Sequence, residues 1–293
     1  MQGRTDLALE AAEQPVRLKS LTNEDIERER VERGSAVLTR IRILSERGEK
    51  SLGKPRGTYI TVEIPALTDH ESELEETARL IGEQIAALLP RKGTVLVVGL
   101  GNEAITPDAL GPQAAKMVLA TRHIRGEFAR TAGLEDLRPT AVMAPGVLGN
   151  TGVESGEMAE GVIAVINPAA VVAIDALAAQ SLSRLGCTVQ LSDTGIAPGS
   201  GVGNNRRALN RETLGIPVVA VGVPTVVDAV TLAEELTGRE EAAGEVTPRG
   251  AGMMVTPREV DLMIRRASRL VAMSVNAALQ PAYSPLELTA AAQ

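Results

Sequence analysis

The stretch that decides the fold is TVLVVGLGN, residues 94–102, which is followed by TPDALGP at residues 106–112. A second stretch of the same kind is AVVAIDAL, residues 170–177. Short β-branched runs bounded by Gly and Pro are typical of strands buried in a parallel sheet. We therefore expect two buried strands, each accompanied by one aspartate.

These aspartates are Asp108, which follows the first strand across a glycine turn, and Asp175, which ends the second strand. In open α/β sheets the functional side chains lie just beyond the carboxyl ends of the strands. If the two strands are neighbours, both carboxyl groups face one crevice, which favours acid–base chemistry. The alternative is that each aspartate caps a helix. The pattern alone leaves both interpretations open.

Strands and helices alternate along most of the chain. This order predicts an α/β fold whose sheet is mostly parallel and carries helices on both faces. The predicted strands cover residues 58–64, 94–99, 141–143, 170–175, 187–191 and 217–221. The predicted helices cover residues 21–33, 71–89, 111–120, 157–166, 176–184, 224–236 and 257–279.

The domain organisation is predicted from changes in periodicity. Residues 1–20 show little periodicity and are expected to form a flexible N-terminal arm. Residues 21–293 are expected to form a single α/β domain, in which the polar, glycine-rich stretch 237–252 is a surface loop.

The composition excludes several classes of protein. The formal net charge is −7, and the chain has no Trp, one Phe and two Tyr. A nucleic-acid-binding protein would normally present a basic face and aromatic side chains for stacking, so we expect no direct nucleic-acid binding. The single Cys187 rules out an intramolecular disulfide, and no apolar run has the length of a membrane span. We expect a cytoplasmic protein that does not bind membranes.

Two further motifs lie near the predicted crevice. Gly99 and Gly101, with Asn102 after them, form a G-x-G turn, but a dinucleotide fingerprint needs a third glycine where Ala104 stands. We interpret these three residues as a sharp turn that lines the site. Asp193 lies in a D-T-G triplet of the kind found in aspartic proteases, but those β-rich proteins use two triplets. We interpret this match as accidental. Asp193 remains a third candidate acid because it can lie at a strand end near the same crevice.

Metal binding has little support in the sequence. The chain has only two histidines, His70 and His123, and neither forms a His/Cys cluster of the kind that holds zinc. We therefore expect no metal and no cofactor. The glycine-rich loop at 195–205, next to Arg206 and Arg207, lacks the Lys-Ser/Thr ending of a P-loop and is interpreted as a structural or substrate-lining loop.

The motifs around these residues closely resemble the germination protease family of spore-forming bacteria. The resemblance covers residues 55 to 280, which makes it specific. The matching segments are 97–102, 106–112, 121–123, 144–147, 151–152, 173–179, 192–196, 198–204, 213–218, 222–230, 254–257 and 259–261.

The resemblance implies an endopeptidase that degrades small acid-soluble spore proteins in the spore core during germination. It implies a fold similar to that of hydrogenase maturation peptidases and a metal-free, aspartic mechanism in which Asp108 and Asp175 are the catalytic acids. Members of the family are made as zymogens that cut themselves, and by this likeness residues 1–20 contain a propeptide cut between Asp6 and Leu7. The family also implies a homotetramer.

Two other functions stay open at this point. One is a metal-dependent peptidase of the maturation type, which a chelator would inactivate. The other is a non-catalytic binding module with a nucleotide-binding fold, which would bind nucleotides without hydrolysing peptides.

Overall fold

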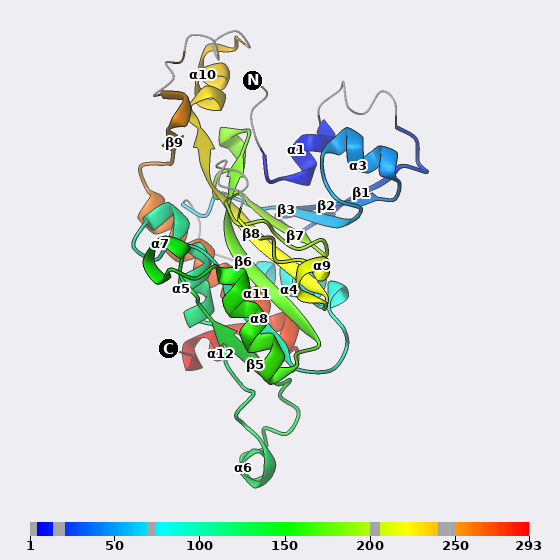
Figure 1. Cartoon of the computed structure of the whole chain (residues 1–293), viewed down its shortest axis with the longest axis vertical. Coiled ribbons are helices and arrows are strands. Elements are labelled where there is room, and N and C mark those ends of the chain that lie inside the picture. The colour runs from blue at the N-terminus through cyan, green and yellow to red at the C-terminus, as the bar shows by residue number, and fades with distance from the viewer. Residues whose placement is uncertain are drawn as a thin grey trace.

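The computed structural model describes residues 5–13, 21–68, 74–199, 206–239, 246 and 250–292. A single mixed sheet organises this part of the chain, in the order β1-β2-β3-β7-β8-β6-β4-β5, with the short β9 (Met254–Val255) paired to β8. Figure 1 shows the first three strands, with α1 (Ala8–Glu13) and α3 (Glu46–Leu52), extending to one side of the molecule.

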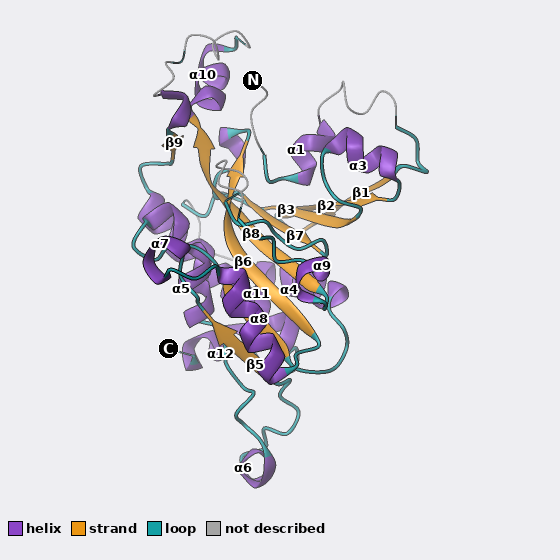
Figure 2. Cartoon of the chain, in the orientation of Figure 1, coloured by secondary structure: helices purple, strands orange, loops and turns teal. Residues whose placement is uncertain are grey.

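The centre of the sheet is parallel and almost fully buried. It consists of β5 (Thr140–Met143), β4 (Val95–Gly99), β6 (Ala170–Ala179) and β8 (Val218–Asp228). Alternate side chains of these strands point to opposite faces, and both faces are covered by helices, as predicted. One face packs against α4 (Leu74–Leu88), α5 (Leu110–Lys116) and α11 (Val260–Leu279), and the other packs against α8 (Ser155–Ile166) and α9 (Arg211–Leu214). Figure 2 shows these helices around the strands.

The prediction of a mostly parallel sheet was wrong. Among the described residues, five of the eight strand pairings are antiparallel. The antiparallel part is formed by β1 (Ile26–Arg33), β2 (Ala36–Ile43), β3 (Gly57–Glu63) and β7 (Thr188–Ser192), which join the parallel centre where β7 pairs with β8. The alternation of strands and α-helices therefore fails before residue 64, and it fails again between β6 and β7.

The prediction of a helix at residues 21–33 was also wrong, because β1 occupies most of this segment. β1 is an exposed edge strand, so both of its faces carry charge and the period of two is hidden. Its glutamates instead face arginines of β2: Glu29 lies opposite Arg40 and Glu27 opposite Arg42, with N–O distances of 3.3 and 2.9 Å. Such cross-strand pairs stabilise a strand that has little to bury.

The first residues of two predicted helices belong to strands in the structure. β6 continues to Ala179 and β8 to Asp228, since the two strands remain paired beyond Asp175. The short 3-10 helix Leu182–Arg184 is all that follows β6, and α10 (Ala229–Thr237) begins only after Asp228, whose carboxylate accepts from the Thr231 N–H at 2.7 Å. Pro224 lies within β8, next to the point where its register with β6 shifts.

The described residues of the N-terminal segment are packed, in contrast to the expected arm. Leu7 is fully buried, and Leu9 of α1 packs with Ile41, Leu52 and Tyr59. The remaining α-helices of the described residues are α6 (Gly126–Thr131), α7 (Leu148–Thr151) and α12 (Pro285–Ala291). The division of the chain at residue 20 stays a prediction. No helix in the described ranges is both long and apolar enough to cross a membrane.

Candidate active site

The ends of β4 and β6 bring the two predicted acids together. Gly99 pairs with Ile174 in the parallel register, and the Leu100 N–H donates to the Ile174 carbonyl oxygen at 2.8 Å. The loop that leaves β4 therefore starts beside Asp175. This is the neighbouring arrangement of the two strands on which the acid–base hypothesis depended.

A tight turn fixes Asp108 in this loop. The Asn102 N–H donates to Asp108 Oδ2 at 2.8 Å. Gly101 has a φ of +114°, and a Cβ at this position would lie 2.1 Å from the Asp108 carbonyl oxygen. Only glycine allows this conformation and this close approach. The G-x-G turn thus serves to position a carboxyl group.

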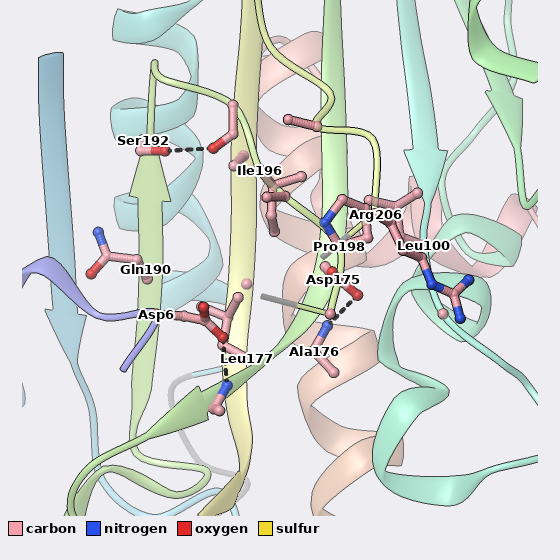
Figure 3. Close-up of a pocket in the computed structure, with 18 of the residues that line it drawn as sticks. Asp6, Leu100, Asp175, Ala176, Leu177, Gln190, Ser192, Ile196, Pro198 and Arg206 are labelled. Atoms are coloured by element: carbon pink, nitrogen blue, oxygen red, sulfur yellow. Dashed lines mark hydrogen bonds between the residues drawn. The ribbon is translucent and has the colours of Figure 1, made fainter. Parts of the chain in front are cut away.

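Asp175 lies inside β6, rather than at its end as predicted. The residue is 5% exposed, and its Oδ1 accepts from the Ala176 N–H at 3.0 Å, as Figure 3 shows. Its carboxyl group points into a cavity that Asp108 also lines.

Both carboxyl groups have raised pKa values. Burial is the main cause for Asp175, and the negative charges of Asp108 and Asp6 add to it, so its pKa lies well above the usual range. Burial also raises the pKa of Asp108, although the Asn102 N–H and the positive charge of Arg206 oppose this effect. Two coupled acids in one site favour a state in which they share a proton. Asp175 is the more deeply buried of the two, so the shared proton favours its carboxyl group.

The cavity has a volume of about 620 Å³ and is large enough for several residues of a peptide. Its wall is mainly apolar near the acids, with Leu100, Ile105, Leu177 and Ile196 among the lining residues. Burying acids against apolar groups is a general means of holding one of them protonated near neutral pH.

The predicted self-processing bond lies at the same cavity. Asp6 lines it, and its carboxylate is close enough to Asp175 to raise the pKa of that residue. Leu7 is fully buried against Leu177, Ala179 and Val227. The N-terminal segment therefore reaches the site at Asp6 and is buried from Leu7 onward.

Two other residues that the sequence analysis placed in the site, Asp193 and Gly99, have different roles in the structure. Asp193 is exposed and is not among the lining residues; its carboxylate accepts from the Thr58 N–H at 2.7 Å. A Cβ on Gly99 would meet the Gly111 carbonyl oxygen at 2.2 Å, so Gly99 allows α5 to approach β4.

Neither histidine is found among the described residues that line the cavity. His123 is exposed and precedes α6, and His70 lies outside the described residues, as do residues 200–205. Within the described ranges, no three His, Cys, Asp or Glu side chains form a metal-binding group.

Two functional candidates were missed by the sequence analysis: Lys54 and Thr225. Arg206 was noted only as a neighbour of the glycine-rich loop, and in the structure it lines the cavity. Thr225 lies where the register of β8 against β6 shifts, and its hydroxyl donates to the Pro107 carbonyl oxygen at 2.8 Å, which ties the Asp108 turn to β8. The signal for this irregularity was Pro224, because proline inside a strand is often found at a bulge. No sequence pattern indicated Lys54, which reaches the site from the loop after α3.

The known proteins that this chain resembles are germination proteases. The sequence model of the germination protease family matches residues 4–238. The germination protease of Caldanaerobacter subterraneus is 42% identical, over 97% of this chain and 96% of its own. That of Clostridium acetobutylicum is 38% identical over 97% of both chains, and that of Bacillus velezensis is 36% identical over 96% and 94%.

An α/β protein that is 42% identical to a protease over 97% of its length is a peptidase. The chain belongs to the germination protease family.

Proposed function

We propose that this chain is an endopeptidase, made as a zymogen, that begins the degradation of small acid-soluble spore proteins in the spore core during germination. Asp108 and Asp175 are its catalytic acids, Gly101 and Asn102 shape the turn that holds Asp108, and no metal takes part. The observation that carries this proposal is that buried Asp175 and half-buried Asp108 line one cavity with Asp6, and that the charge of Asp108 helps to raise the pKa of Asp175.

The reaction follows from the protonation states that the site favours. Ionised Asp108 accepts a proton from water, whose oxygen attacks the carbonyl carbon of the scissile bond. Protonated Asp175 gives its proton to the nitrogen of the leaving amine as the C–N bond breaks. The products are a new carboxylate and a new amine, and the proton balance of the two acids is restored by exchange with solvent.

The test is to follow the full-length chain by mass spectrometry from mildly acidic to neutral pH, with and without EDTA. We expect cleavage between Asp6 and Leu7, followed by cleavage of added small acid-soluble spore proteins, at rates that EDTA leaves unchanged. Loss of cleavage in EDTA that one divalent ion restores would favour the metal-dependent alternative. Nucleotide binding without any hydrolysis would favour the binding module.

We also propose that the protein is a homotetramer, as the family resemblance implied. Large apolar side chains on its surface support an assembly, since Val165 of α8 is 80% exposed and Leu236 of α10 is 72% exposed. Light scattering is expected to give four times the chain mass of 30.7 kDa. A monomeric mass at micromolar concentration would contradict this proposal.

A further inference from the structure

The segment before the proposed cleavage bond lies beside the end of β6 and pairs with it in an unusual way. The Asp6 N–H donates to the Ala178 carbonyl oxygen at 3.1 Å, as in a β-ladder. In an antiparallel pair the Ala178 N–H would donate back to the Asp6 carbonyl oxygen. It donates instead to the Asp6 carboxylate, Oδ2, at 2.9 Å, a bond drawn in Figure 3.

The displaced carbonyl oxygen of Asp6 has another partner. Lys54 Nζ donates to this oxygen at 3.1 Å and to the Thr5 carbonyl oxygen at 3.0 Å. The Asp6 carbonyl belongs to the Asp6–Leu7 peptide bond. A positively charged donor thus lies at hydrogen-bond distance from the oxygen that becomes negative when water attacks this bond.

The loop that carries Lys54 is held on both sides. Gly53 ends α3 in the left-handed conformation, with a φ of +65°, and its N–H donates to the Glu49 carbonyl oxygen at 2.8 Å. On the other side, the Pro55 carbonyl oxygen accepts from the hydroxyl of Tyr59, a buried residue of β3, at 2.8 Å. Lys54 is therefore presented from a fixed backbone, which is what preorganised stabilisation of a transition state requires.

We propose that Lys54 is a third catalytic residue, which binds the carbonyl oxygen of the scissile bond. This inference rests on the proposed function. When water attacks the Asp6 carbonyl carbon, the π electrons of the carbonyl move to its oxygen, and the Lys54 ammonium stabilises the resulting negative charge. The electron pair then returns to re-form the C=O bond as the C–N bond breaks and Asp175 protonates the leaving nitrogen. The new carboxylic acid loses its remaining proton to solvent.

The same geometry gives a physical reason for an acidic residue directly before the bond. Its carboxylate accepts the hydrogen bond from the Ala178 N–H, which in a regular β-ladder would go to the carbonyl oxygen of the scissile bond. The carbonyl oxygen is thereby turned towards Lys54.

The test compares self-processing of full-length Lys54→Met, Lys54→Arg and wild-type chains. We expect Lys54→Met to slow cleavage of the Asp6–Leu7 bond by about a hundredfold to a thousandfold. Lys54→Arg, which keeps a charged donor, should recover most of the lost rate. The matched control is Lys50→Met, because Lys50 lies on the exposed side of α3, paired with Glu46, and its loss should leave the rate at the wild-type value.

A second measurement separates catalysis from docking of the segment. Hydrogen exchange at the Asp6 amide, measured in uncut chains that carry Asp108→Asn, should show equal protection with and without Lys54→Met. Loss of protection together with loss of cleavage would overturn the proposal, since Lys54 would then only hold the segment. Unchanged cleavage in Lys54→Met would also overturn it. Wild-type cleavage rates in Asp108→Asn and Asp175→Asn would instead refute the proposed function.

Discussion

Replacing Asp108 or Asp175 with asparagine is expected to slow cleavage of the Asp6–Leu7 bond and of added spore proteins by about a hundredfold to ten-thousandfold. An amide at position 108 cannot accept a proton from water, and an amide at position 175 cannot give one to the leaving amine. The measurement is the rate of appearance of chains that begin at Leu7. The control is Asp136→Asn, which changes an exposed carboxylate outside the cavity and should leave the rate unchanged.

Stability measurements show whether such a loss reflects unfolding. Because the pKa of Asp175 is raised in the folded state, folding favours its protonated form. Its contribution to stability is thus full at low pH and falls as pH rises from the ordinary aspartate value to the raised one. Asp175→Asn removes this pH-dependent loss of stability, because an amide does not ionise. Its side-chain oxygen can still accept the hydrogen bond from the Ala176 N–H. At pH 7 its free energy of unfolding in urea should exceed that of the wild type by about 0.5–2 kcal/mol.

An inactive Asp175→Asn chain that is more stable than the wild type would support a purely chemical role for this acid. A less stable one would mean that partners in the cavity hold Asp175 ionised. That outcome would contradict the assignment of the shared proton to this residue.

Replacing Gly111 with alanine is expected to destabilise the fold by about 3 kcal/mol or more, the upper end for overpacking. A Cβ on Gly111 would lie 2.2 Å from the Leu100 carbonyl oxygen and 2.5 Å from that of Ile174. Both are backbone atoms of the segments that carry the acids, so relief would require α5 to move away from β4 and β6. Urea unfolding measures the free energy of unfolding. Cleavage of the Asp6–Leu7 bond should be lost even under conditions in which the variant is folded.

The matched control for this substitution is Gly161→Ala. Gly161 is an exposed residue in the middle of α8, and no atom lies within 4 Å of a Cβ at this position. Alanine there should stabilise the protein by about 0.5–1 kcal/mol, because it favours the helix. Equal stability of Gly111→Ala and the wild type would show that α5 can shift on the sheet.

The buried strands at residues 94–99 and 170–175 and the amphipathic helices around them were predictable, because burial leaves a clear apolar periodicity. The edge strand β1 was not, since its stability comes from arginines of β2 that follow it along the chain. The extensions of β6 and β8 were missed for a related reason. The segments at 176–179 and 223–227 are strands because they pair with each other, and neither carries that information alone.

The sequence by itself determined the family, the central strands and the two aspartates, because these depend on local patterns and on motifs that survive in order along the chain. Only the tertiary structure decided that Asp6, Asp108 and Asp175 share one cavity, and that Lys54 reaches the Asp6 carbonyl oxygen. The physical reason is that pKa shifts and hydrogen bonds at this site arise between residues up to about 170 positions apart. Their proximity is created by strand pairing and burial, which no single segment encodes.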